Sequence, residues 1–257
     1  MTAAAALSLL ALAGFGTVIV FEIPHTADDA MYHAEAFSGD PGEVIVWRCP
    51  SEDCSSYTVE EMELGIAEGD FEASMKRDLM RQSTVFVPVP VDLIDPDDIF
   101  VKKAAQEILS RTEGYSDSAR MTAALWFVQS AIRYTSDEDL YGCSEFWATP
   151  TETLYLQRGD CEDTSVLLCS ILLAMGIPCV LLDYDGHEAV GVLQGDCQTL
   201  DDYLFCETAT DITERPGAPW FEGDPDIYVP GGQPRINSLL NGGIASYRNL
   251  IQRVAGT

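Results

Sequence analysis

The sequence predicts an α+β domain that follows a single membrane-spanning helix. An uncharged stretch opens the chain, from Ala3 to Phe21. Helical patterns then predominate as far as Met175, and short strand-like runs follow between Cys179 and Thr208. Helices followed by a run of strands indicate that a central helix packs on an antiparallel sheet.

The stretch from Ala3 to Phe21 is close to the roughly 20 apolar residues that a helix needs to cross a bilayer. Two alternatives are a buried helix of a soluble domain and a cleaved signal peptide, since Ala11-Leu12-Ala13 has the form of a cleavage site. A cut there would leave a short apolar region without a basic flank, so we favour an uncleaved anchor. No Lys or Arg precedes Arg48, and acids follow the stretch, so the main domain is expected outside the cell membrane.

The chain has 257 residues, with 42 acidic and 14 basic side chains and a formal net charge of −28. This balance excludes nucleic-acid partners, which require clusters of Lys and Arg, and it opposes docking on anionic lipid head groups. Because 47% of the residues are hydrophobic, the chain is not a disordered acidic tail. An acidic surface with few lysines is typical of halophilic proteins, so we expect a protein adapted to high salt.

The elements before the proposed central helix are short. A strand is expected at 43–47, a helix at 70–81 and an extended segment at 84–93, where prolines oppose a central strand. Asp97 or Asp98 can cap a helix that ends near Arg111. A second helix begins at Ser116 or Ser118 and runs to about 134, with apolar residues spaced three or four apart. A loop is expected at 135–150.

A short helix at 151–157 precedes an apolar helix at 161–175, which Gly176 and Pro178 terminate. Because this helix is apolar all round, we place it at the centre of the core. Strands are expected at 179–184, 189–193 and 203–208, and a terminal helix at 244–254.

The eight cysteines are compatible with an exterior location. Cys49 and Cys54 bracket one short loop, and Cys197 and Cys206 bracket another segment, so either pair can form a local disulfide. Zinc is the competing interpretation of the first pair, but a lone C-x4-C is a weak signal. Cys169 and Cys179 lie among Leu, Ile and Val, which indicates buried, unreactive thiols.

Cys161 is the candidate nucleophile. Gly159 permits a sharp turn before it, and Cys161 then falls in the first turn of the central helix. The helix dipole and unpaired N–H groups at that position stabilise a thiolate and can hold an oxyanion. The flanking acids Asp160, Glu162 and Asp163 act against this, because like charges raise the pKa of the thiol.

A general base is needed, and the chain has His25, His33 and His187 to offer. His187 is favoured, because it stands at the start of a strand in the region of Cys161. A third residue should fix the tautomer of this imidazole. Glu207 is the acid in the most apolar setting. The alternatives are Asp201, Asp202 and Asp211.

Five segments of the chain together resemble a known family. Trp147 to Leu154 (WATPTETL) precedes Gly159 to Asp163 (GDCED), and Gly176-Ile177-Pro178, Gly186-His187 and Glu207-Thr208 follow in order. Together these segments resemble the transglutaminase-like superfamily, and more narrowly its bacterial cysteine peptidases and related archaeal membrane-attached proteins. The resemblance covers roughly residues 98–215.

The resemblance implies a papain-like or transglutaminase-like core with a catalytic Cys161, His187 and Glu207. In two places the chain departs from the family pattern: Glu188 and Ala189 follow the histidine where many members have Ala and an aromatic residue, and the third member is commonly Asp. The implied division of the chain is an anchor at 1–22, an extension at 23–97, a catalytic core at 98–215 and a Pro- and Gly-rich segment with a helix at 216–257.

The implied reaction is acyl transfer on a protein or peptide substrate, through a thioester on Cys161. Water as acceptor gives a peptidase or amidase, and a lysine amine gives a transglutaminase. The alternatives are a catalytically silent module that binds a peptide or surface partner, and a zinc site of Cys161, His187 and Glu207. Trp147 is a candidate oxyanion donor through its indole N–H.

Asp160 and Glu162 have two interpretations. As carboxylates they can bind Ca²⁺, a hard cation that prefers oxygen ligands. Alternatively, together with Asp163, they cap the helix and compensate the charge of its first turn, which is the favoured interpretation. No other cofactor is expected.

Overall fold

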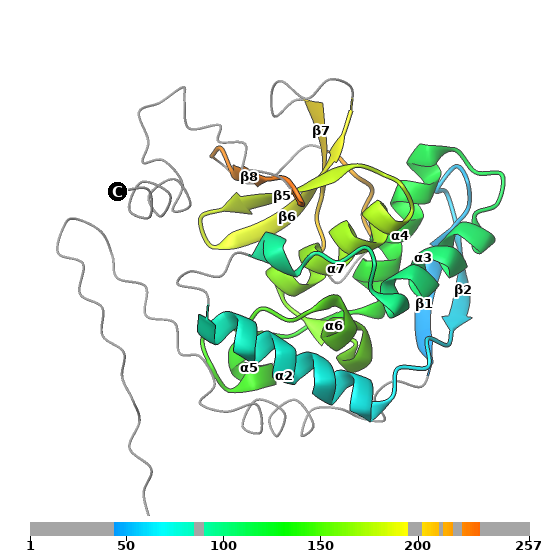
Figure 1. Ribbon diagram of the computed structural model, residues 1–257. Helices are drawn as coiled ribbons and strands as arrows, with labels where there is room; N and C mark the ends of the chain where they lie inside the picture. The colour runs from blue at the N-terminus through cyan, green and yellow to red at the C-terminus, as the bar shows by residue number, and fades with distance from the viewer. Residues whose placement is uncertain (1–43, 85–89, 195–201, 211–212, 218–222, 232–257) are drawn as a thin grey trace, which may run out of the picture.

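The computed structural model describes residues 44–84, 90–194, 202–210, 213–217 and 223–231 (Figure 1). Its architecture is α+β, as the sequence predicts: a group of helices lies against one four-stranded antiparallel sheet. The larger helices are α2 (Glu68–Thr84), α3 (Ile99–Arg111), α4 (Asp117–Ala131) and α7 (Cys161–Ala174). The shorter ones are α5 (Asp137–Tyr141), α6 (Pro150–Leu156) and a 3₁₀ helix at Pro90–Leu93.

The four-stranded sheet has the order β7-β6-β5-β8. Its strands are β5 (Cys179–Tyr184), β6 (His187–Leu193), β7 (Tyr203–Cys206) and β8 (Asp226–Tyr228). β5 and β6 form a hairpin in which Tyr184 pairs with His187. The turn between them contains Gly186 at φ 76°, a conformation that glycine adopts without strain. This tight turn places His187 at the first position of β6.

Helix α7 lies at the centre of the core and packs on β5 and β6 (Figure 1). Its side chains from Val166 to Cys169 are fully buried. An apolar sequence on all sides of a helix requires neighbours on all sides, and α3, α4 and α6 supply them. The expected packing of the central helix on an antiparallel sheet is therefore confirmed.

A separate two-stranded antiparallel sheet joins β1 (Ile45–Pro50) to β2 (Tyr57–Met62). Trp47 on β1 is 1% exposed and packs edge-on against Phe127 of α4, with ring centroids 5.6 Å apart. These strands thus contribute to the same hydrophobic core as α7.

Several sequence predictions are wrong in detail. Residues 90–93 form a 3₁₀ helix rather than an extended segment, and α5 lies within the predicted loop at 135–150. Helix α4 ends at Ala131, because Arg133 and Tyr134 form β3, which pairs in parallel with β4 (Arg158–Gly159). Strands β2 and β8 were not predicted, since the acidic run YTVEEM and the short DIY carry little apolar alternation.

The Cys49–Cys54 disulfide is also wrong, because both thiols are free. Cys49 is buried on the core side of β1, whereas Cys54 lies in the turn after it, where Ser51 and Ser55 hydrogen-bond to Asp53 instead. Cys206 is also a free, buried thiol, and Cys197 lies outside the described residues. Cys169 and Cys179 are buried as predicted.

The N-terminal apolar stretch and the terminal helix expected at 244–254 lie outside the described residues. Among the helices that are described, none has the length and apolar character that a membrane span needs.

Candidate active site

Cys161 is the first residue of α7, as the sequence predicts. The chain enters the helix through Gly159, where an added Cβ would lie 2.7 Å from the Cβ of Asp163. Only glycine fits this close approach, because Asp163 is completely buried and its Oδ1 accepts a 2.7 Å hydrogen bond from the N–H of Ala148. Gly159 and Asp163 therefore hold the segment before α6 against the start of α7.

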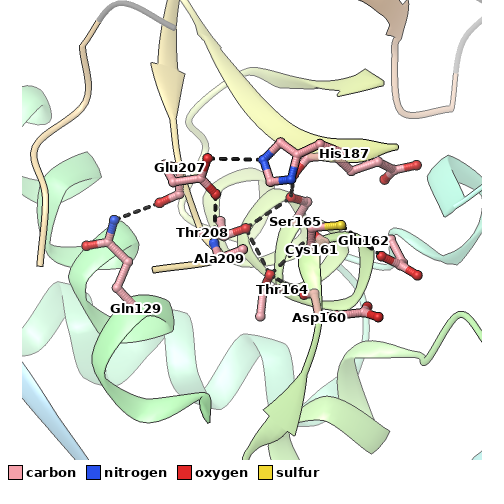
Figure 2. A network of polar contacts seen from close by, with 11 residues as sticks. Gln129, Asp160, Cys161, Glu162, Thr164, Ser165, His187, Glu207, Thr208 and Ala209 are labelled. Carbon is pink, nitrogen blue, oxygen red and sulfur yellow. Dashed lines mark hydrogen bonds and ion pairs between the residues drawn. The ribbon is translucent and has the colours of Figure 1, made fainter. Parts of the chain in front are cut away.

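His187, at the start of β6, and Glu207, directly after β7, form a largely buried pair. The Nε2 atom of His187 lies 3.0 Å from Oε2 of Glu207, and the two side chains are 16% and 3% exposed. Figure 2 shows the imidazole between Glu207 and Cys161. The other carboxylate oxygen of Glu207 accepts a 2.8 Å hydrogen bond from the N–H of Ala209, so both oxygens are partnered.

The backbone of Glu207 is fixed as well. Its carbonyl oxygen accepts a 2.6 Å hydrogen bond from Nε2 of Gln129 on α4. The next residue, Thr208, makes hydroxyl contacts of 2.9 Å with Thr164 and 3.1 Å with Ser165, both in the first turns of α7 (Figure 2). These contacts tie the acid-bearing segment to the helix that carries the candidate nucleophile.

The Cys161 thiol lies among acids. Its Sγ donates a hydrogen bond of 3.1 Å to Oε2 of Glu162. Burial raises the pKa of this thiol well above its usual range, and the negative charges of Glu162 and Asp160 raise it further. A backbone hydrogen bond from Glu188 acts in the opposite direction. Negative charge on these acids therefore opposes ionisation of the Cys161 thiol.

Three of the acids form a compact group, the acid cluster of Asp137, Asp160 and Glu162. One carboxylate oxygen of each lies within 4.8 Å of the others. Burial, followed by the charges of the neighbouring acids, raises the pKa of all three. Oδ1 of Asp137 and Oδ1 of Asp160 are buried without a hydrogen-bond partner among the described residues. Such a group of carboxylates has the chemistry of a site for a hard cation.

The flanking acids were expected either to cap α7 or to bind Ca²⁺. Asp160 occupies the N-cap position of α7, but its side chain makes no capping hydrogen bond. The prediction that it caps the helix is therefore wrong, because its carboxylate belongs to the acid cluster instead. Asp163 has a structural role, because its carboxylate accepts a hydrogen bond from the N–H of Ala148.

Trp147, the candidate oxyanion donor, contacts Glu145. Its indole N–H donates a 2.6 Å hydrogen bond to Oε1 of Glu145, and its role as an oxyanion donor stays a prediction. Burial, and then the charge of Glu162, raises the pKa of Glu145 to about 7. Tyr134 is affected by the same acids. Burial, and then the charges of Asp160 and Cys161, raises the pKa of its phenol to about 12.

The structure thus brings Cys161, His187 and Glu207 to one end of α7 (Figure 2). The acid cluster lies beside them, since two of its members, Asp160 and Glu162, flank Cys161 in the chain. Asp137 and Gln129 were not expected at the site, and Thr208 was expected only as part of the Glu207-Thr208 motif, without a role. Asp137 follows Ser136, and a Ser-Asp pair at a helix start was the available signal for α5. Gln129 carries no local signal, because it acts through Glu207, which is distant in the sequence.

Comparisons with known proteins are consistent with this geometry. Residues 145–213 match the family model of the CEP76 peptidase-like domain, and this segment includes Cys161, His187 and Glu207. The match supports placing the chain in the transglutaminase-like superfamily. No curated protein matches the chain.

Two solved structures of Legionella pneumophila LapG are similar to the chain. The EGTA-treated form is 12% identical, covers 60% of this chain and 95% of LapG, and has a TM-score of 0.37. The calcium-bound form is 14% identical, covers 64% of this chain and 94% of LapG, and has a TM-score of 0.38.

Proposed function

We propose that the protein is a cysteine acyl-transfer enzyme that hydrolyses peptide or amide bonds through a thioester on Cys161. The observation that carries this proposal is the 3.0 Å contact between His187 and Glu207, at the end of α7 where Cys161 begins the helix. A nucleophile, a base and an acid that orients the base are the parts that acyl transfer requires.

In this reaction His187 accepts the proton of the Cys161 thiol, and the sulfur attacks the carbonyl carbon of the substrate. The imidazolium then protonates the leaving amine as the C–N bond breaks and a thioester forms. Water, deprotonated by His187, hydrolyses the thioester and restores the thiol. Glu207 holds the proton of Nε2, so that the other ring nitrogen serves as the base, and it stabilises the imidazolium.

Ionisation of Cys161 requires that the charge of the acid cluster be neutralised. We propose that Asp137, Asp160 and Glu162 hold a Ca²⁺ ion. The donor set fits a hard cation, because it consists of carboxylate oxygens and two of them are buried without a partner among the described residues. An ion held there would offset most of the negative charge of these three carboxylates. Cys161 could then give its proton to His187 with less repulsion from the acids beside the sulfur.

Two other candidates share the same residues. A lysine amine in place of water makes the enzyme a transglutaminase. A catalytically silent module that binds a peptide or surface partner is favoured by one observation, the raised pKa of Cys161 among its acids. We place hydrolysis first, because the matched family model is that of a peptidase-like domain.

The experiment that separates these candidates is incubation of the full chain with a mixture of diverse peptides, with Ca²⁺ or with EGTA, at low and high salt. We expect new peptide termini with the wild type and none with Cys161→Ala, while Cys54→Ala, which removes another partly exposed thiol, keeps wild-type activity. Cross-linked peptides instead of new termini would identify a transglutaminase. Peptide binding without either product would identify a silent module.

We further propose that the N-terminal apolar stretch anchors this domain to the outer side of a cell membrane in a salt-rich setting. The uncharged segment Ala3–Phe21 and the net charge of −28 support this proposal. Extraction of the cell membrane with alkaline carbonate should leave the protein in the pellet, and external protease should digest it in intact cells. Release into the carbonate supernatant would contradict the anchor.

A further inference from the structure

A pocket lies beside the candidate nucleophile and outside the Cys161, His187 and Glu207 site described above. Its volume is about 380 Å³, and its lining consists of Arg133, Tyr134, Thr135, Ser136, Asp139 and Arg158. The arginines belong to β3 and β4, whose parallel pairing places Arg133 opposite Arg158. Arg158 lies three residues before Cys161, and β4 leads through Gly159 and Asp160 directly into α7. The pocket is therefore next to the position where a substrate bond would be attacked.

The two arginines differ from several other basic side chains of this acidic protein. Four of the others form ion pairs with acids: Lys76, Lys102, Arg111 and Arg120. Neither Arg133 nor Arg158 has an acidic partner within ion-pair distance among the described residues. Asp139, which also lines the pocket, pairs with neither.

The pairing of the strands explains why these charges lie together. Residues opposite each other on adjacent strands project from the same face, so the parallel register brings two positive side chains to one side of β3 and β4. Like charges in such a position repel each other, and an anion bound between them removes the repulsion. The two arginines outnumber the one acid of the lining, Asp139, so the lining side chains themselves carry a net positive charge in a chain of net charge −28.

We propose that this pocket binds an acidic side chain, Asp or Glu, of the peptide that Cys161 attacks. This inference rests on the proposed function, since it names the specificity of the same site. A guanidinium binds a carboxylate through two parallel hydrogen bonds, which distinguishes Glu from Gln at the same position. Arg133 is exposed and Arg158 is half-buried, so the carboxylate can enter from solvent.

The test is a comparison of the wild type with the double variant Arg133→Gln/Arg158→Gln, on the full chain with Ca²⁺ present. Arg77→Gln is the matched control, because Arg77 is an exposed arginine of α2 away from this pocket. Profiling with diverse peptides first identifies the substrate position enriched in Asp or Glu. A peptide pair that differs only by Glu or Gln at this position then gives kcat/KM for each enzyme.

We expect the wild type and Arg77→Gln to cleave the Glu peptide about tenfold more efficiently than the Gln peptide, a preference that high salt reduces. The double variant should cleave both peptides equally, because the preference for Glu is lost with the two guanidinium groups. Absence of an acidic preference in the wild type, or its survival in the double variant, would overturn the inference.

A binding measurement separates this inference from the proposed function. Cys161→Ala, labelled with ¹⁵N at arginine, is titrated with acetyl-glutamate methylamide or acetyl-glutamine methylamide, and the two Nε signals are assigned by their loss in the single variants. Shifts with the glutamate compound alone support the pocket even if no peptide is ever cleaved. If neither compound shifts these signals, the pocket assignment is wrong whatever the activity.

Discussion

Two sets of buried carboxylates flank Cys161, and they differ in how their oxygens are partnered. On one side, Glu207 contacts His187 through one oxygen and the N–H of Ala209 through the other. On the other side, Asp137 and Asp160 each have a buried oxygen without a partner among the described residues. A satisfied carboxylate is stable as it stands, whereas unsatisfied ones are costly to keep ionised.

This difference indicates separate roles. The Glu207 side is preorganised, because Gln129, Thr208 and Ala209 fix the acid before any substrate arrives. The acid cluster lacks such fixed partners, and its carboxylates need a positive charge to offset their own when they are ionised. Substitutions on the first side should therefore impair catalysis directly, and those on the second should change the response to cations, to pH and to thiol reagents.

The largest effect is expected for Glu207→Gln. The amide cannot hold the same imidazole tautomer or stabilise the imidazolium, so kcat should fall by about 100- to 10,000-fold with little change in stability. Steady-state kinetics on a cleaved peptide measure this. Glu113→Gln, on the surface after α3, is the control and should keep wild-type kcat. A Glu207→Gln enzyme with wild-type kcat would remove Glu207 from the mechanism.

The second prediction concerns Ca²⁺ itself. At a concentration about 100 times its dissociation constant, an ion bound only by the folded state adds about 2.7 kcal/mol of stability. In a protein of this size we expect Tm to rise by about 5 to 10 °C. Asp137→Asn should abolish most of this rise, because it removes one ligand of the acid cluster.

Glu138→Gln is the matched control, since it removes an exposed acid from the same helix. Thermal unfolding of each variant in Ca²⁺, Mg²⁺ or EGTA gives the comparison. An equal rise of Tm in Asp137→Asn and the wild type would place the ion elsewhere.

The sequence could predict the Glu207 side but only part of the acid cluster. Cys161, His187 and Glu207 lie in a continuous region where each stands at the start or end of an apolar element, so their positions follow from periodicity and from the family motif. Asp137 comes from α5, in a segment without apolar periodicity that predicts a loop. Its approach to Asp160 depends on the parallel pairing of β3 with β4, which are too short to leave a pattern.

The same contrast applies to the rest of the fold. Strand β5 and the end of α7 agree with the sequence prediction to within a residue, because a long apolar run ends at Gly176 and Pro178. The Cys49–Cys54 disulfide could not be judged from sequence, since the spacing of two cysteines does not show that one of them faces a core.

The third prediction is a pH dependence of stability in EGTA. Burial raises the pKa of Glu145 to about 7 and of Asp183 to about 6, and it raises the pKa values of the acid cluster as well. The unfolded carboxyls have pKa values near 4, so between about pH 4 and pH 7 the folded state binds more protons. Their contribution is complete below pH 4 and is lost as the pH rises through the folded values.

We therefore expect Tm in EGTA to be about 5 °C lower at pH 8 than at pH 5. Ca²⁺ should reduce this slope, because the cation favours the ionised form of its ligands. Glu145→Gln should also reduce it, whereas Glu113→Gln should not. A Tm that rises between pH 5 and pH 8 in EGTA would show that the acids are neutralised by something other than protons.

The smallest effect is expected for Glu162→Gln, measured by the rate at which iodoacetamide alkylates Cys161 in EGTA. Burial is the largest cause of the raised thiol pKa and persists in the variant, but the negative charge 3.1 Å from the sulfur is removed. A pKa lower by about one unit gives about tenfold more thiolate and a correspondingly faster alkylation at pH 8. Cys54 in the same sample is the internal control, and its rate should not change. If Cys161 is alkylated no faster in Glu162→Gln than in the wild type, the acid cluster does not set the reactivity of the nucleophile. The proposed difference in role between the two sides of Cys161 would then fail.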